Sequence, residues 1–426
     1  MASAPGASLP RAPRIALFGL FGVGNLGNEG SLEAMVSQLR DLLPSAALAC
    51  VCPRPDIVHN DHGLGGFPID AQQPGTVTHR SFFSRCYAGA VRRSAFLREI
   101  VSCFRIFRYL SEVDAIVVPG TGILDDFGVR PFQFPYTIFR WFFLARVRQI
   151  PVILVSVGAG PISHPLSRWF MTKAASFARY RSYRDQLSKD FLFAAGIDIR
   201  QDPVYPDLVF TLPRPSSEDP SPRPATPLTI GFGVMAYNGW SDRLDADRSA
   251  YLAYLDKIAT FVRWLLQRGC IVRILLGDPA GDARAANDLL SALAKHNFAP
   301  DRLVYRPVRS LSELLQTIAL TDLVVATRFH NIVGALFLGR PALSFGYAAK
   351  NAAVMSEFGL GDFCQSVDGL DVGVLTAQFE KLLKMRDQHE SRIATTLRAF
   401  DARIADQRRW LAGALDQCLP FPHPSG

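Results

Sequence analysis

One pattern recurs along the chain: a short run rich in Val, Ile and Leu ends in Gly, Asp or Pro and precedes a segment of helix length. Buried strands that alternate with helices are typical of parallel α/β construction. The pattern predicts five such strands in each half of the chain. They are residues 15–19, 47–52, 115–118, 152–157 and 180–183 in the first half, and 228–233, 271–276, 302–305, 323–326 and 342–345 in the second.

The length of 426 residues exceeds what one typical domain uses, and a stretch too rich in Pro and Ser to pack as an element separates the two halves. We predict an α/β fold of two doubly wound, Rossmann-like domains that face each other across a cleft. Ligands of such folds bind outside the carboxyl ends of the strands, between the domains. The predicted ranges are 14–211 for the N-terminal domain, 212–226 for a linker, 227–384 for the C-terminal domain and 385–426 for a helical segment with a tail.

The composition excludes several other classes of protein. No apolar run reaches the roughly 18 residues that cross a bilayer, and Gly and Asn soon interrupt the apolar stretch that begins at Ile15. We therefore expect a cytoplasmic protein. The seven cysteines include no CxxC pair and have no His at ligand spacing, which predicts reduced thiols and no structural zinc. No pattern resembles a divalent-metal triad, so no metal is expected.

Much of the formal charge of +8 lies in residues 80–109, where aromatic side chains alternate with seven arginines and one glutamate. One interpretation is a solvated basic helix face. The other is a peripheral contact with anionic lipid at the inner face of the membrane, or a grip on a phosphorylated acceptor. Nucleic acid is not an expected partner, because no recognition motif accompanies the charge. The arginines are Arg80, Arg85, Arg92, Arg93, Arg98, Arg105 and Arg108.

Three glycine turns directly follow strands and are expected to open one rim of the first sheet. Such turns let the backbone approach an anion, which a helix N-terminus then stabilises. The first turn satisfies GxGxxG, but the second strand ends in Cys-Pro-Arg and not in the acidic residue of a dinucleotide site. A tight turn without a ligand is the alternative at each of them. The residues are Gly24, Asn25, Gly27, Asn28 and Glu29 in the first turn, Gly120, Thr121 and Gly122 in the second, and Gly158 and Gly160 in the third.

Charged residues follow three further strands. Arg184 is suited to hold a carboxylate or phosphate in a bidentate fork, while Asp185 is suited to cap the next helix; a structural Arg-Asp pair is the alternative. If the strand 323–326 runs on, Arg328 and His330 face the same side beside a helix N-terminus, where an Arg fixes an anion and a His transfers a proton. His330 as a packing residue is the alternative. Lys350 is a further cation there or a surface lysine.

In this order, the motifs resemble those of the polysaccharide pyruvyl transferase family over about residues 14–360. Members open with Gly-Asn-x-Gly-Asp-Glu, matched by residues 24–29, and carry turns like 120–122 and 158–161, an Arg-Asp like 184–185 and an Asp turn near Asp207. The most specific match is an Arg-x-His before an apolar helix with a Tyr-x-x-Lys after the next strand, at 328–330 and 347–350. Asn28 replaces the usual Asp, which removes a charge.

The resemblance implies a fold similar to the GT-B glycosyltransferases and a reaction with phosphoenolpyruvate as donor and no cofactor. Pyruvate would be transferred as a ketal to two hydroxyls of a saccharide, with release of phosphate. The saccharide acceptor would be either free or lipid-linked. Arg184, Arg328 and Lys350 are the expected anion-binding residues, and His330 is the expected general acid. The glycine turns are expected to contribute to substrate binding.

Two other functions remain open from the sequence. A GT-B glycosyltransferase that uses a nucleotide sugar would show the same fold and the same glycine turns. A non-catalytic member that binds saccharide is the second alternative, and Asn28 is the residue that argues for it.

Overall fold

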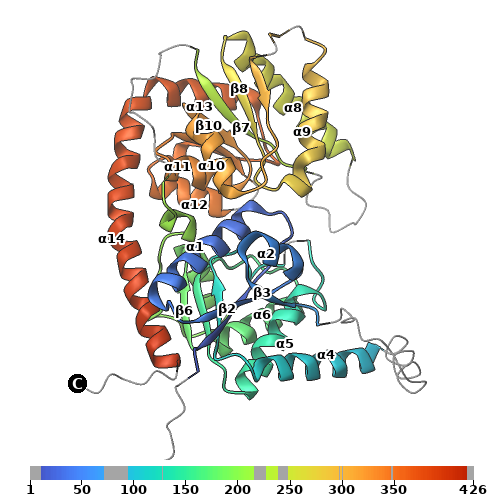
Figure 1. Cartoon of the computed structure of the whole chain (residues 1–426). Coiled ribbons are helices and arrows are strands. Elements are labelled where there is room, and N and C mark those ends of the chain that lie inside the picture. The colour runs from blue at the N-terminus through green and yellow to red at the C-terminus, as the bar shows by residue number, and fades with distance from the viewer. Residues whose placement is uncertain are drawn as a thin grey trace, which may run out of the picture.

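The computed structural model describes residues 11–71, 95–126, 128–214, 227–237, 248–296, 298–299, 301–346 and 349–419. Two six-stranded sheets, each flanked by helices, lie one above the other along the long axis of the molecule (Figure 1). All the strand pairs within both sheets are parallel. The predicted α/β fold of two Rossmann-like domains is confirmed.

The N-terminal sheet has the strand order β3-β2-β1-β4-β5-β6. Every residue of β4 and β5 is buried, as expected for strands that helices cover on both faces. The five strands predicted in this half are all present. The bounds are β1 Arg14–Phe18, β2 Ala47–Cys52, β3 Gly65–Pro68, β4 Ala115–Pro119, β5 Val152–Val157 and β6 Tyr180–Tyr183.

Alternate residues of these strands fill two separate cores, because successive side chains point to opposite faces of a sheet. Phe18 and Val118 pack in the core beneath α4 (Ala95–Leu110), α5 (Phe134–Val147), α6 (Pro165–Phe177) and α7 (Gln186–Ala194). Leu17 and Val117 pack in the opposite core, beneath α1 (Leu26–Leu42), α2 (Pro55–His62) and α14 (Arg386–Cys418). Both faces of the sheet are therefore covered by apolar side chains, and polar side chains that could bind a ligand lie at the strand ends.

The C-terminal sheet repeats this plan with the order β12-β11-β10-β7-β8-β9. Its strands are β7 Thr229–Gly233, β8 Ile271–Leu275, β9 Leu303–Tyr305, β10 Leu323–Ala326, β11 Ala342–Gly346 and β12 Cys364–Ser366. Its helices are α8 Arg248–Gln267, α9 Pro279–Leu293, α10 Leu311–Ala319, α11 Phe329–Phe337, α12 Ala349–Glu357 and α13 Val372–Lys384.

Two strands and one helix start differ from the predictions. The edge strands β3 and β12 were not predicted, because Gly-Gly-Phe-Pro and Cys-Gln-Ser are short and lack the runs of Val, Ile and Leu that identify the other strands. Strand β10 ends at Ala326 and helix α11 begins at Phe329, so the strand does not run on through Arg328. Most of the predicted linker, residues 215–226, lies outside the described residues.

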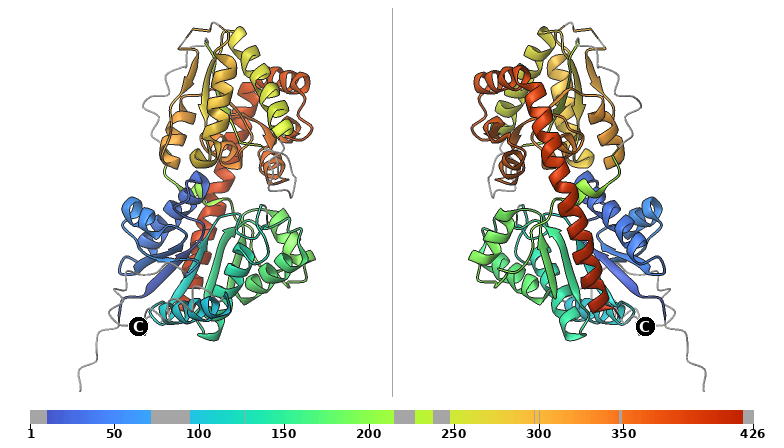
Figure 2. Two further views of the ribbon diagram at one scale, coloured as in Figure 1. Left: turned by 90° about the vertical axis from the view of Figure 1, so that its right-hand side faces the viewer. Right: turned by 90° about the vertical axis from the view of Figure 1, so that its left-hand side faces the viewer.

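Helix α14 joins the two domains along one side of the molecule (Figures 1 and 2). Its first half places Ile393 and Phe400 in the core of the C-terminal domain, and its second half places Leu411 and Leu415 in a core of the N-terminal domain. Between them, the Gln407 amide donates a hydrogen bond to the hydroxyl of buried Ser156 on β5. Among the described residues, no helix is both long and apolar enough to span a membrane.

We predict that Leu411→Ala lowers the free energy of unfolding by about 2–5 kcal/mol, because it leaves a cavity in a fully buried contact between α14 and the N-terminal domain. Chemical denaturation followed by circular dichroism measures the change. Leu252→Ala is the matched control, since Leu252 is half exposed on α8, and equal losses in the two variants would contradict this role of α14.

Candidate functional site

The first glycine turn is built to accept the C-terminal domain. Asn25 caps α1, and its side-chain oxygen accepts hydrogen bonds from the backbone N–H groups of Gly27 and Asn28. The backbone N–H of Leu26 donates to the carbonyl of Gly277 in the other domain, over 3.1 Å. A Cβ on Gly24 would lie 3.0 Å from Ala280, and one on Gly27 would lie 1.9 Å from Nδ1 of His330. The space above Gly27 thus holds a histidine ring.

Asn28 and Glu29 stabilise this turn from within. The Asn28 amide donates to the carbonyl of Leu20 over 3.1 Å, a bond that the usual Asp would make only when protonated. The Glu29 carboxylate accepts from the backbone N–H of Gly22 over 2.8 Å. Burial raises the pKa of Glu29 to about 7. The replacement of Asp by Asn28 is therefore accommodated by a specific hydrogen bond.

The second and third turns lie side by side at the same rim. The backbone N–H of Gly158 donates to the carbonyl of Thr121 over 2.9 Å, which joins the two turns. Leu208 covers Gly120, and Phe191 covers Gly160; both glycines have a positive φ, of 24° and 68°. These two glycines serve packing, while Gly122 and Gly158 face charged side chains.

Arg184 extends from the end of β6 across the third turn. A Cβ on Gly158 would lie 2.5 Å from its guanidinium, so the glycine is required for this path. The guanidinium carbon lies 4.6 Å from the centre of the Phe329 ring. Two carboxylates hold it: Asp185 at 3.4 Å, which also caps α7 as predicted, and Asp207 at 3.7 Å. Arg184 thus connects the N-terminal domain to the first turn of α11.

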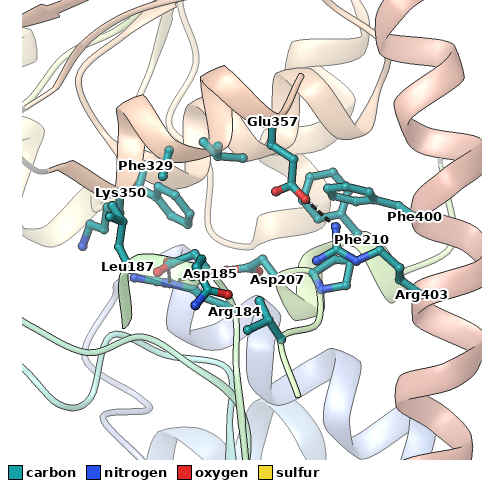
Figure 3. A pocket seen from close by; sticks show the side chains of 15 residues that line it. Arg184, Asp185, Leu187, Asp207, Phe210, Phe329, Lys350, Glu357, Phe400 and Arg403 are labelled. Atoms are coloured by element: carbon teal, nitrogen blue, oxygen red, sulfur yellow. Dashed lines mark hydrogen bonds and ion pairs between the residues drawn. The ribbon is translucent and has the colours of Figure 1, made fainter. Parts of the chain in front are cut away.

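Lys350, the second residue of α12, approaches the same point from the C-terminal domain. Its Nζ lies 5.7 Å from the centre of the Phe329 ring. The position that a Cβ of Gly122 would take lies 3.5 Å from Nη2 of Arg184 and 3.9 Å from Nζ of Lys350. Figure 3 shows the two cations around Phe329, with Asp207 beyond Arg184. Two positive charges from different domains therefore converge on the Gly122 turn.

His330 lies in the first turn of α11, between Gly27 and Asp207. Its side chain is only 14 % exposed, and its Nε2 lies 3.9 Å from Oδ2 of Asp207. Within the described structure, neither of these facing atoms has a hydrogen-bond partner. Burial and the charges of Arg184, Lys350 and Arg328 lower the pKa of His330 to about 3. Burial raises the pKa of Asp207, an effect that Arg184 opposes.

This pKa favours the neutral imidazole near neutral pH. It lies below the range of the histidine that the sequence led us to expect, which would titrate near neutral pH.

Arg328 points away from this group. It is the residue that precedes α11, and its Nε and Nη2 each donate to the carboxylate of Asp282 over 2.7 Å. Asp282 is fully buried in the first turn of α9, and Asp278 lies 3.7 Å from the same guanidinium. In a strand, Arg328 and His330 would point to the same side. They do not, because β10 has already ended at Ala326.

A cavity of about 340 Å³ lies between the domains beside this group. Arg184, Asp207, Phe329 and Lys350 line one end of it. The other end is formed by α12 and α14, where Glu357 and Arg403 form an ion pair beside Phe400 (Figure 3).

The sequence did not single out Asp282, Glu357 or Arg403, and it gave Asp207 only as part of a turn. The place of Asp282 in the first turn of a helix could have been predicted, because acidic residues are common there. Its ion pair with Arg328 could not, because no local sequence pattern indicates it.

The model of the polysaccharide pyruvyl transferase family matches residues 25–348. The chain belongs to this family. Membership indicates a transferase role in polysaccharide modification. A curated relative, the amylovoran biosynthesis protein AmsJ of Erwinia amylovora, is 22 % identical over 298 residues, which cover 67 % of this chain and 69 % of AmsJ.

Solved structures show the same fold at low sequence identity. A UDP-GlcNAc 2-epimerase of Neisseria meningitidis bound to UDP-GlcNAc superposes with a TM-score of 0.53 at 10 % identity, over 92 % of this chain and all of that chain. A glycosyltransferase of Rickettsia africae gives a TM-score of 0.56 at 9 % identity, over 97 % of this chain and all of the other. This pyruvyl transferase family member therefore has a GT-B-like fold, as predicted.

We predict that His330 stays neutral from about pH 8 down to about pH 5, the range in which an ordinary histidine gains its proton. Burial and three nearby cations disfavour the charged ring. The ¹⁵N chemical shifts of the ring report its charge directly, and comparison with His330→Asn assigns the signals. A midpoint near pH 6.5 would contradict the buried, cation-lined environment.

We also predict that Arg328→Ala lowers the free energy of unfolding by about 3–5 kcal/mol, because it leaves the buried Asp282 carboxylate without its partner. The double variant Arg328→Leu/Asp282→Leu removes both charges and should regain most of the loss. Denaturation of the two proteins measures the difference. A double variant no more stable than the single one would argue against an ion pair at this position.

Proposed function

We propose that this protein transfers pyruvate from phosphoenolpyruvate to two hydroxyls of a saccharide as a ketal, with release of phosphate. The observation that carries the proposal is the approach of Arg184 and Lys350, from two domains, to the Gly122 turn beside a cavity that both line, with His330 near enough for both charges to lower its pKa. Family membership supports the transferase class, and the relative named for amylovoran biosynthesis supports a polysaccharide acceptor.

Arg184 and Lys350 bind the donor in this proposal. Phosphoenolpyruvate carries a carboxylate and a phosphate, so it needs two cationic partners in a fixed relation. Arg184 offers a planar fork, held by Asp185 and Asp207, and Lys350 offers a point charge close to it. At Gly122 no Cβ occupies the space in front of both cations, and the Asp125 carboxylate lies 3.4 Å from the same position.

His330 then acts as the proton donor. Burial lowers the pKa of His330 most, and three cations add to that effect; the negative charges of the donor oppose the contribution of the cations, so binding raises the pKa toward the imidazolium. Its facing neighbour Asp207 lies at 3.9 Å and stabilises that charged form. In this proposal, donor binding makes proton transfer from His330 more favourable. A preorganised cationic frame of this kind stabilises a transition state without rearrangement.

The proposed reaction begins with proton transfer from His330. The imidazolium of His330 gives its proton to the methylene carbon, and the oxygen of the first hydroxyl bonds to the adjacent carbon while neutral His330 accepts that hydroxyl's proton. The bond between this carbon and the phosphate oxygen breaks, and phosphate leaves. The second hydroxyl closes the ketal. The second hydroxyl gives its proton to the released phosphate, and His330 ends protonated as it began, so the net transfer is one proton to the methyl group and one to phosphate.

Arg328 is a positioning residue in this scheme. Its two bonds to Asp282 fix the start of α11, and with it the place of His330, while its charge contributes to the field at the ring. This role replaces direct binding of the donor by Arg328, which the sequence had suggested.

A glycosyltransferase that uses a nucleotide sugar is the second candidate, and the observation that favours it is the fold shared with the Rickettsia africae glycosyltransferase. A rise in melting temperature with a nucleoside diphosphate, and none with phosphoenolpyruvate, would select it. Absence of any donor turnover in the presence of acceptor would select the non-catalytic alternative.

We predict that Arg184→Gln lowers the rate of phosphate release from phosphoenolpyruvate in the presence of acceptor by about a hundredfold to a thousandfold, since it removes a charge that binds the reacting anion. His330→Ala and Arg328→Ala should also abolish measurable release. Arg200→Gln is the matched control, because Arg200 is an exposed arginine of the same domain, paired only with exposed Asp198 in the described structure. Release at the wild-type rate in Arg184→Gln or His330→Ala would refute these assignments.

A further inference from the structure

Helix α4 carries a row of apolar side chains that face water. Phe96, Ile100 and Phe104 follow one another at four-residue spacing and are 74 %, 49 % and 66 % exposed, and Phe107 continues the row. The opposite side of the same helix is buried in the core through Ile106. A helix that serves only to cover a sheet needs one apolar side, so the second row requires its own explanation.

The row continues onto the neighbouring helices. The guanidinium carbon of Arg148, the residue that ends α5, lies 4.3 Å from the centre of the Phe107 ring and links α4 to α5. On α5, Phe143 is 44 % exposed and stacks on Phe139, whose ring also lies 5.2 Å from that of Trp169 on α6. The three helices form the outer layer of one face of the N-terminal domain (Figure 1). The exposed rings therefore belong to one surface, which we call the α4–α6 face.

The α4–α6 face is positively charged. The sequences of the three helices contain seven basic residues and one acidic residue, Glu99. Glu99 is turned inward, where it accepts hydrogen bonds from Tyr136 over 2.7 Å and from Arg140 over 2.9 Å. The exposed charged side chains of the three helices are consequently all basic. The exposed basic residues are Arg98, Arg108, Arg146, Arg168 and Lys173.

We infer that the α4–α6 face docks on a bilayer that contains anionic lipid. Exposed Phe and Trp side chains enter the boundary between head groups and acyl chains, while Arg and Lys side chains pair with lipid phosphates. A second copy of the chain fits this surface poorly, because two such faces brought together would oppose like charges. The inference uses only the helices and does not depend on the proposed reaction.

This surface refines the expectation of a lipid contact in residues 80–109. Residues 80–94 lie outside the described structure, whereas α5 and α6, which the sequence did not implicate, contribute Phe143 and Trp169. Exposed Phe132 lies in the segment between the Gly122 turn and α5, and its ring is 5.9 Å from that of Phe170 on α6. If the proposed function holds, a docked protein would receive a saccharide acceptor that is itself anchored in the membrane.

Co-sedimentation of the full chain with vesicles tests the inference. We expect the protein to pellet with vesicles of phosphatidylcholine and phosphatidylglycerol, to pellet much less with phosphatidylcholine alone, and to be released by salt. Phe96→Ser/Phe104→Ser should weaken binding at least about tenfold, because two inserted rings are lost. Arg98→Gln/Arg108→Gln should remove most of the preference for the anionic vesicles.

Matched controls lie on the other domain: Leu252→Ser replaces an exposed apolar residue of α8, and Arg284→Gln replaces an exposed arginine of α9. Both should bind vesicles like the wild type. The inference is overturned if wild-type protein stays in the supernatant, if controls and α4 variants lose binding equally, or if light scattering shows that Phe96→Ser/Phe104→Ser splits a dimer. Phosphate release with a soluble acceptor should be unchanged in the α4 variants, which separates this test from that of the proposed function.

Discussion

The ring of His330 rests on Gly27 so closely that a Cβ at residue 27 would lie 1.9 Å from Nδ1. This contact sets how near α11 of one domain can come to α1 of the other. Two further contacts hold the domains close together. The backbone N–H of Leu26 donates to the carbonyl of Gly277, and Gly30 lacks the Cβ that would clash with Leu311. A larger residue in place of Gly27 or Gly30 would push the domains apart. The glycines therefore determine the spacing at which Arg184 and Lys350 reach a common point.

The electrostatics of the site follow from that spacing. Burial and three nearby cations lower the pKa of His330, and Asp207 faces the ring at 3.9 Å without a hydrogen bond to it. Arg184 compensates Asp207 and Asp185, and Arg328 compensates Asp282. Arg184 and Lys350 approach the same position at Gly122, with the Asp125 carboxylate 3.4 Å from it. This is where we propose that the anionic donor binds.

Much of the fold could be predicted from the sequence, because buried parallel strands leave a continuous apolar run and a turn residue at each end. Val152–Val157 illustrates this, with all six residues buried. The structure brings Arg184, His330 and Lys350 near one another from distant segments, so that both cations lower the pKa of His330. The expectation for Arg328 was wrong. It failed where the local conformation changed within two residues. Arg328 has an extended backbone at ψ 134°, but the strand pairing has ended and a helix begins at the next residue, which sends the guanidinium toward α9. Its partner Asp282 lies 46 residues away along the sequence, and no local sequence pattern predicts such an ion pair.

The pKa of His330 could not be predicted for a related reason. Sequence identifies a histidine, whose ordinary pKa lies near neutrality, but the shift is the sum of burial and of charges that come from Arg184 in one domain and Lys350 in the other. The contribution of Arg184 exists only when the domains meet, and that of Lys350 only when α11 and α12 pack together. Burial lowers the pKa of His330 most, and the nearby cations lower it further, so this histidine differs from one paired with a carboxylate in an open site. In the reaction that we propose, the negative charges of the donor oppose the contribution of the cations, so that part of the free energy of donor binding raises the pKa of the ring.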